Sequence, residues 1–224
     1  MSFRNIKIML VEDHAIVREG YRSLLGKQPD MEIIAEAADG EEAYILYKEL
    51  KPNLVVMDLS LPGQGGLATI VRIRKFNSEA NILVFSMHQN PVLALKSTQA
   101  GARGYVTKSS PPDVLIRAIY DVHRGRIALS ADIVQALALE QLGGENGALA
   151  ELTIREFEIL RMLVEAKSTN DIAKTLNISP KTVSNSHYLI KRKLGVTSDI
   201  ELTRLAIKLN VINLLELSGS LPVN

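Results

Sequence analysis

The feature that most constrains the fold of this chain is an alternation of short apolar runs with longer amphipathic segments over residues 5–125. The apolar runs are 6–11 (IKIMLV), 31–36 (MEIIAE), 53–58 (NLVVMD), 81–86 (NILVFS) and 103–108 (RGYVTK). The amphipathic segments are 14–27, 39–50, 65–75, 90–100 and 112–124. Strands that alternate with helices favour a parallel sheet covered on both faces. We therefore predict a doubly wound α/β domain of five β–α units.

Polar side chains stand at the carboxyl ends of four of the predicted strands. The first strand is followed by Glu12 and Asp13, the third ends at Asp58, the fourth at Ser86 and the fifth at Lys108. The carboxyl ends of parallel strands meet at one edge of the sheet, where doubly wound proteins bind their ligands. We expect these five side chains to lie close together at that edge.

This set of side chains suits phosphoryl transfer. Three carboxylates at one edge repel one another, and a hard divalent cation such as Mg²⁺ removes that repulsion. Lys108 and Ser86 can then hold a phosphoryl group opposite the metal, and Asp58 can accept it as an acyl phosphate. Taken singly, each residue is better interpreted as a turn, helix-capping, core or surface residue. Their joint placement at four strand ends favours the reactive site.

The set Glu-Asp at 12–13, DLSLPG at 58–63, Ser86 and Tyr-x-x-Lys at 105–108 closely resembles the receiver domain of two-component response regulators. The resemblance covers residues 5–125 and implies a flavodoxin-like fold. It implies the following roles: Asp58 as the phosphoacceptor, Asp13 and Asp58 as direct Mg²⁺ ligands with the backbone carbonyl of Ser60, Glu12 acting on the metal through water, Ser86 and Lys108 as partners of the phosphoryl group, and Tyr105 as an aromatic switch that follows Ser86.

Two positions depart from the pattern of many receivers. Ser109 stands where many have a proline after a cis peptide bond, and a cis bond before serine would cost about 3–4 kcal/mol. Glu12 replaces the commoner aspartate, which leaves the metal site plausible but altered.

The haloacid-dehalogenase phosphatases are an alternative class, because they also combine an aspartate nucleophile with Mg²⁺. They need a second acid two residues after the nucleophile, and Ser60 occupies that position here. We therefore expect a protein that is not an enzyme, in which Asp58 only accepts a phosphoryl group and loses it by self-dephosphorylation.

Residues 126–151 show a different pattern. LSADIVQALALEQL is compatible with a short helix, and the Gly-rich, polar GGENGALAE after it is typical of a flexible linker. A surface loop within one domain is the alternative. We favour a linker because a new helical pattern begins immediately afterwards.

From residue 152 the capping residues predict four short helices, at 154–166, 169–177, 180–194 and 199–210. Thr153 with Glu156 and Ser198 with Glu201 form capping boxes, and Ser168 can cap the second helix. The third helix begins with the pair Ser179–Pro180 and ends at Gly195. The few residues between the second and third helices are typical of a helix-turn-helix.

The third helix has two distinct faces. One carries Val183, Ile190 and Leu194, with His187 at its edge as a packing residue. The opposite face carries polar, aromatic and basic side chains: Lys181, Ser184, Asn185, Tyr188, Lys191 and Arg192. Asparagine can read adenine in the major groove, and lysine and arginine anchor phosphates. This face therefore suits DNA.

LTIREFEIL, STNDIAKTLNISPKTVSNSH and IKRKLGV together closely resemble the LuxR-type helix-turn-helix of NarL/FixJ response regulators, over residues 152–212. The positions that match DNA-contacting residues of that family are Thr182, Ser184, Asn185, Tyr188, Lys191 and Arg192. Ser184 replaces a lysine and Ser186 a histidine of many relatives. Losing about one phosphate contact weakens binding and lowers the salt slope by roughly one unit.

The whole chain is thus predicted to comprise a receiver (1–125), a linker (126–151), a DNA-binding domain (152–212) and a tail (213–224). A sensor histidine kinase would phosphorylate Asp58, and the protein would then bind promoter double-stranded DNA as a homodimer. A receiver whose C-terminal domain binds protein or RNA is the alternative. A net charge of +1, the absence of cysteine and an N-terminus without a signal or membrane segment indicate a cytoplasmic protein.

Overall fold

The computed structural model describes residues 5–142, 147–209 and 211. The chain divides into two compact units, Met1–Leu137 and Ala138–Asn224, and each is described by itself. The tail predicted at 213–224 lies outside the described residues.

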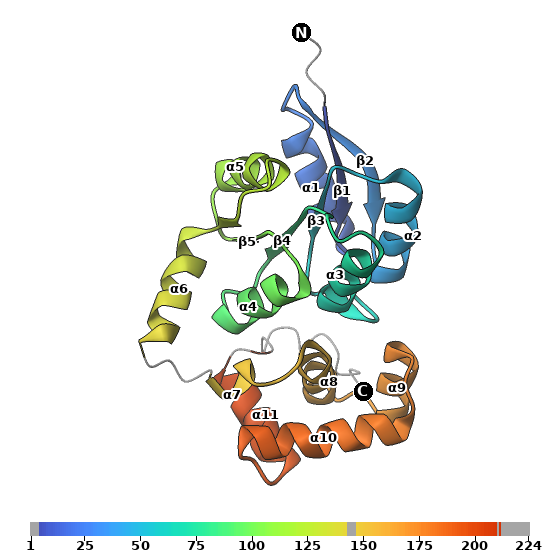
Figure 1. The fold of residues 1–224 in the computed structure, drawn as a ribbon, viewed down its shortest axis with the longest axis vertical. Helices are drawn as coiled ribbons and strands as arrows, with labels where there is room; N and C mark the ends of the chain where they lie inside the picture. Colours follow the sequence, from blue (N-terminus) through green and yellow to red (C-terminus); the bar gives the residue numbers. More distant parts are fainter. Residues whose placement is uncertain (1–4, 143–146, 210, 212–224) are drawn as a thin grey trace. The chain divides into compact units, whose positions relative to one another are not determined.

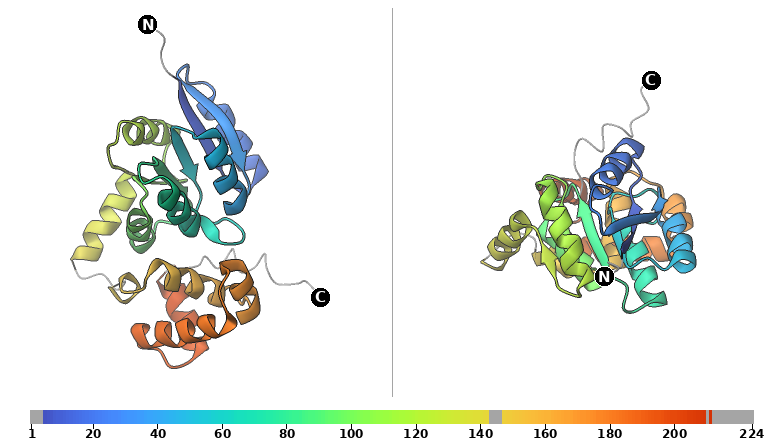
Figure 2. Two further views of the ribbon diagram at one scale, coloured as in Figure 1. Left: turned by 45° about the vertical axis from the view of Figure 1, so that its right-hand side comes forward. Right: turned by 90° about the horizontal axis from the view of Figure 1, so that it is seen from above.

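The first unit is a parallel sheet in the strand order β2-β1-β3-β4-β5-β6 (Figures 1 and 2). Its strands are β1 (Ile6–Val11), β2 (Met31–Ala37), β3 (Leu54–Met57), β4 (Ile82–Ser86), β5 (Gly104–Thr107) and β6 (Ala128–Leu129). Its helices are α1 (Ala15–Leu25), α2 (Gly40–Leu50), α3 (Gly65–Phe76), α4 (Pro91–Ala100) and α5 (Pro112–His123). The predicted doubly wound domain of five β–α units is confirmed.

The two faces of the sheet carry different helices. Leu25 of α1 and Leu115, Ile119 and Val122 of α5 share one buried cluster with strand residues such as Ile8. On the other face α2 packs against α3, and α3 against α4 (Figure 1). All four residues of β3 are buried because both faces are covered, which explains its unbroken apolar run.

The sixth strand was not predicted. Ala128 and Leu129, in the stretch predicted to be linker, pair in parallel with Gly104 and Tyr105 of β5. The Ala128 amide donates to the Arg103 carbonyl at 3.1 Å. Two residues are too few for a periodic signal, so only the available edge of β5 could reveal this strand.

The linker region is partly helical, as predicted for its first half. Helix α6 (Ala131–Gln141) follows β6. The Gly-rich half, which was predicted to be flexible, contains 143–146, outside the described residues, and helix α7 (Gly147–Ala150). The prediction is wrong for α7, because Leu149 is fully buried in the second unit, where α7 packs against α10.

The second unit contains the four predicted helices, α8 (Ile154–Val164), α9 (Thr169–Leu176), α10 (Pro180–Leu194) and α11 (Asp199–Lys208). Both capping boxes form, and Ser168 and Ser179 accept hydrogen bonds from backbone amides at the starts of α9 and α10. Gly195 ends α10 at φ +67°, a conformation that glycine adopts without strain. Three helices end one or two residues before the predicted position.

Glu156 joins α8 to α10. Its carboxylate accepts from the Thr153 amide at 2.8 Å and from Lys193 Nζ at 2.7 and 2.8 Å. Burial opposes ionisation of Glu156, but the hydrogen bonds from Lys193 and Thr153 outweigh it and lower the pKa of the carboxyl. A lowered pKa stabilises the folded state above the usual glutamate pKa, and the effect disappears as the pH falls through the folded value.

We expect Glu156→Gln to destabilise the second unit by about 1 kcal/mol at neutral pH, since it loses the charge of a capping and ion-pair group. Amide hydrogen exchange of α8 and α10 in the full chain measures this effect, which should shrink below about pH 4. The control is Glu165→Gln, which removes only the ion pairs with Arg161 and Lys167. Equal effects of the two variants at neutral pH would contradict the role of Glu156.

Candidate functional site

The predicted polar set lies at one edge of the sheet. The strand register pairs Val11 with Met57, and Ser86 with Thr107, so the carboxyl ends of β1, β3, β4 and β5 lie side by side. Glu12 and Asp13 follow β1, Asp58 follows β3, Ser86 ends β4 and Lys108 follows β5. The parallel topology therefore brings these side chains to a common edge.

Lys108 is the centre of this cluster. Its Nζ lies 2.5 Å from Glu12 Oε2 and 2.8 Å from Asp58 Oδ2, and the three side chains are only 7, 6 and 4% exposed. Burial disfavours the ammonium, but the charge of Asp58 and hydrogen bonds to Asp58 and Glu12 outweigh it and raise the pKa of Lys108. A charged lysine thus balances two buried carboxylates.

The second oxygen of Asp58 is held by the backbone. Asp58 Oδ1 accepts from the Leu59 amide at 2.7 Å and from the Ser60 amide at 3.3 Å. These bonds fix the rotation of the carboxylate, so Oδ2 points to Lys108. Ser60 Oγ makes a separate hydrogen bond with His88 Nε2 at 3.1 Å.

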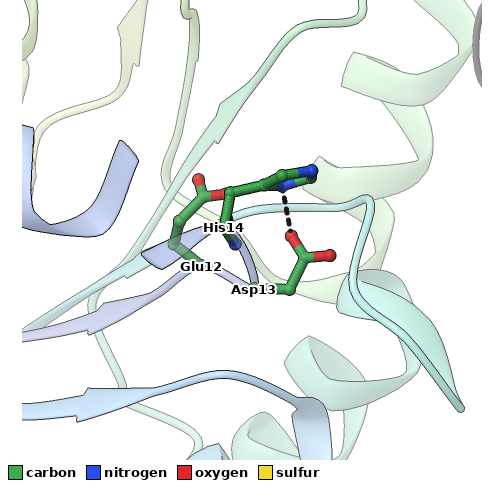
Figure 3. Close-up of side chains that lie close together, drawn as sticks. All are labelled: Glu12, Asp13 and His14. Carbon is green, nitrogen blue, oxygen red and sulfur yellow. Dashed lines mark hydrogen bonds and ion pairs between the residues drawn. The ribbon is translucent and has the colours of Figure 1, made fainter. Parts of the chain in front are cut away.

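Glu12, Asp13 and His14 form a compact group of possible metal ligands, whose ligand atoms all lie within 4.8 Å of one another (Figure 3). Asp13 Oδ1 is buried, and its partner within the described part of the chain is the His14 imidazole, whose Nδ1 lies 2.8 Å away. The Asp13 charge is the main cause that raises the pKa of His14. This Asp13 oxygen lies close to the Glu12 carboxylate, and carboxylate oxygens are ligands that suit a hard cation such as Mg²⁺.

Tyr105 points into the protein. It is 1% exposed, and its hydroxyl donates to the His88 carbonyl at 2.9 Å. Burial raises the pKa of Tyr105, and a hydrogen bond with Ser86 opposes that change. Ser86 is fully buried, and its Oγ accepts from the His88 amide at 3.3 Å. The inward position of Tyr105 is therefore already occupied in this structure.

His88 was missed by the sequence analysis. It contacts Ser60, Ser86 and Tyr105, so it connects the loops after β3 and β4 to the aromatic ring of β5. Its position two residues after Ser86 was the available signal.

The peptide bond before Ser109, where many receivers have a cis bond to proline, is trans here. The described residues contain no cis peptide bond.

Helix α10 has one buried face and one exposed face, as predicted. Val183 and Ile190 are fully buried, and Leu194 is 9% exposed. The exposed members of the predicted DNA-contacting set are Lys181, Thr182, Ser184, Asn185, Tyr188 and Arg192. Tyr188 is 64% exposed, so most of its ring is accessible on the surface of α10.

Lys191 differs from the other members of this set. Its Nζ lies 3.0 Å from Asp199 Oδ1, and His187 Nε2 lies 2.9 Å from the same oxygen. His187 was predicted to be a packing residue, and its close contact with Asp199 was missed. Within the described part of the chain Lys181 and Arg192 make no ion pair, so these two cations are the more available for phosphates.

The fold and the two sites define a two-domain regulator, in which an α/β domain with an acidic, lysine-bridged edge precedes a helix-turn-helix. Two family models match the chain, the response regulator receiver domain over residues 8–120 and the luxR family of bacterial regulatory proteins over residues 150–206. The chain belongs to the response regulators with a LuxR-type helix-turn-helix, the NarL/FixJ family.

Individual proteins resemble the chain over most of its length. It is 35% identical over 216 residues to the response regulator UvrY of Escherichia coli K12. The matched region covers 96% of this chain and 99% of that protein. A LuxR-family response regulator from Aurantimonas sp. SI85-9A1 is 52% identical with a TM-score of 0.61, over 62% of this chain and 99% of that chain. RcsB of Salmonella enterica serovar Typhimurium, bound to the promoter rprA with the phosphomimetic BeF₃⁻, is 28% identical with a TM-score of 0.75, over 89% of this chain and 97% of that chain.

Proposed function

We propose that Asp58 accepts a phosphoryl group from a sensor histidine kinase or a small phosphodonor. Asp58 Oδ2 would attack phosphorus, forming an O–P bond while the bond from phosphorus to the donor breaks and the leaving group takes up a proton. The observation that carries this proposal is the bridge from Lys108 Nζ to Glu12 Oε2 and Asp58 Oδ2. The ammonium is already beside the atom where phosphoryl charge would develop.

Mg²⁺ would be held by Asp13 and Asp58, with the backbone carbonyl of Ser60 and with Glu12 acting through water. When bound, the metal supplies positive charge to the phosphoryl oxygens. Lys108 and Ser86 would contact the same oxygens from the other side. The residues provide no acid two positions after Asp58, so the protein would retain its phosphoryl group until self-dephosphorylation and would turn over no separate substrate.

Tyr105 would act as the switch that reports phosphorylation. Its buried hydroxyl bonds to the His88 carbonyl, on the loop that Ser86 begins, so a movement of Ser86 toward a phosphoryl group would change the surroundings of the ring. Tyr105→Ala is expected to remove phosphodonor-dependent DNA binding while leaving uptake of the phosphoryl group intact. DNA binding that still responded to the donor would contradict the switch role.

The second unit would bind promoter double-stranded DNA through α10, and the phosphorylated protein would bind as a homodimer. The exposed Lys181, Asn185, Tyr188 and Arg192 support this assignment, as does the similarity to RcsB, which was solved on a promoter. A protein or RNA partner in place of DNA is not favoured. Within the described residues no helix is long and apolar enough to cross a membrane, and we propose a cytoplasmic location.

The direct test is selection of genomic DNA fragments by the purified full chain, with Mg²⁺ and with or without acetyl phosphate. We expect a shared inverted repeat to be enriched only with the donor, because a symmetric dimer presents two copies of α10 to two half-sites. Enrichment that ignored the donor would contradict phosphorylation control. Failure to enrich any sequence in either condition would contradict DNA binding.

A further inference from the structure

The structure assigns a positioning role to Asp132, a residue of the predicted linker. We propose that a hydrogen-bond chain from Gln89 through Ser109 and Thr107 to Asp132 couples the phosphorylation site to the start of helix α6. The proposal rests on phosphorylation of Asp58 as proposed above.

Thr107 is the residue immediately before Lys108, and its hydroxyl lies at the centre of the chain. Thr107 is fully buried, and its Oγ1 lies 2.6 Å from Asp132 Oδ2. The same oxygen lies 3.1 Å from Ser109 Oγ and 3.0 Å from Ser110 Oγ. A threonine hydroxyl donates one hydrogen bond and accepts two, so these three partners satisfy it completely.

The direction of these hydrogen bonds is fixed by Asp132. Burial opposes its ionisation, but the hydrogen bond from Thr107 and the nearby polar groups of Ser130 and the start of α6 outweigh that effect and lower the pKa of the carboxyl. An ionised carboxylate only accepts, so the single proton of Thr107 Oγ1 goes to Asp132. Ser109 and Ser110 must therefore both donate to Thr107.

The chain extends to the loop after β4. Gln89 Nε2 donates to Ser109 Oγ at 3.2 Å, and Gln89 follows His88, the partner of Ser86 and Tyr105. The loops that carry Ser86 and Lys108 thus belong to one polar network. Ser109 makes this possible because the proline found there in many receivers has no hydroxyl.

The start of α6 is bound to β5 at two further points. The Ser130 amide donates to the Tyr105 carbonyl at 3.0 Å, and the Thr107 amide donates to Ser130 Oγ at 3.4 Å. Ser130 is 1% exposed, so water competes little for these bonds. The first turn of α6 is therefore attached to the strand that carries both the proposed switch residue and the lysine beside Asp58.

The chemical consequence is reciprocal coupling. A phosphoryl group on Asp58 would attract Lys108 and Ser86, and the network would transmit the change in their loops to the first turn of α6. By thermodynamic linkage, a variant that breaks the network must also weaken binding of a phosphoryl analogue at Asp58. Asp132 acts through Thr107, so it is a positioning residue and touches no reacting atom.

The test uses the full chain with Mg²⁺ and beryllofluoride, followed by hydrogen exchange of backbone amides. In the wild type we expect beryllofluoride to slow exchange both around residues 58–60 and in the first turn of α6. Thr107→Val and Asp132→Ala are each expected to abolish the effect on α6 and to weaken beryllofluoride binding about tenfold. Thr107→Ser, which keeps the hydroxyl, should behave as the wild type.

The matched control is Asp113→Asn, which removes an exposed aspartate from the first turn of α5 and its ion pair with Arg117. It should leave both responses unchanged. The double variant Thr107→Val with Asp132→Ala should be no weaker than either single variant, because one interaction is lost in all three.

Four outcomes separate the possibilities. Protection of 58–60 without protection of α6 in the wild type would overturn the coupling, and so would wild-type behaviour of both Thr107→Val and Asp132→Ala. Wild-type protein that shows no protection even at residues 58–60 would instead overturn the proposed phosphorylation of Asp58. Thr107→Ser failing like Thr107→Val would show that the methyl packing, and not the hydroxyl, is what matters.

Discussion

Asp58→Asn is expected to abolish uptake of the phosphoryl group and all dependence of DNA binding on a phosphodonor. An amide has neither the charge nor the nucleophilicity of a carboxylate, so no acyl phosphate can form. The variant keeps the shape of the site, because the asparagine carbonyl oxygen can still accept from the Leu59 and Ser60 amides. Loss of response would therefore reflect chemistry and not unfolding.

The measurement has two parts. Phosphate incorporation from acetyl phosphate with Mg²⁺ should fall to the background of a reaction without protein. The ratio of DNA affinities with and without donor should fall from the roughly 5- to 150-fold range of ordinary allosteric coupling to one. Removal of Mg²⁺ by a chelator should reproduce both results with the wild type.

The control for this experiment is again Asp113→Asn, whose carboxylate is exposed and is paired with Arg117. It should incorporate phosphate normally. Donor-dependent DNA binding by Asp58→Asn would show that the donor acts on another residue, and the assignment of the phosphoacceptor would be wrong.

Asn185→Ala is expected to have the largest effect on sequence recognition. Asn185 is exposed on α10, and an amide can donate to and accept from adenine at once. Loss of one such contact should weaken binding to the selected site by about 1–3 kcal/mol, roughly 5- to 150-fold. Binding to unrelated DNA should change little, since phosphate contacts remain.

The basic residues of α10 provide the comparison. Arg192→Ala should weaken binding to all sequences and lower the salt slope by about one unit. Lys191→Ala should change the slope less, because Lys191 is paired with Asp199. Ser184→Lys should raise the salt slope by about one unit, because the new lysine can neutralise one phosphate. The Ser184 hydroxyl that it replaces donates to the Pro180 carbonyl of its own helix at 3.1 Å.

Binding isotherms at several salt concentrations, on the selected site and on unrelated DNA, measure these effects. If Asn185→Ala weakened both kinds of DNA equally, Asn185 would contact the backbone and not a base. Equal slopes for Lys191→Ala and Arg192→Ala would mean that the ion pair with Asp199 opens on DNA.

The local sequence determined most of the secondary structure of both units. The five apolar runs became β1 to β5, and the parallel topology placed Glu12, Asp58, Ser86 and Lys108 at one edge. Capping residues located the helices of the second unit, since Thr153–Glu156 and Ser198–Glu201 act within four residues of one another. Periodicity and capping are short-range, so a single sequence displays them.

The tertiary structure decided which partner each polar side chain has. Lys108 meets Glu12 across 96 positions of the chain, Tyr105 donates to the carbonyl of His88, and Lys191 is paired with Asp199. β6 exists only because β5 has a free edge, and Asp132 meets Thr107 only because β6 returns the chain there. Such contacts depend on the folded path of the backbone, and residue type and spacing along the chain do not encode them individually.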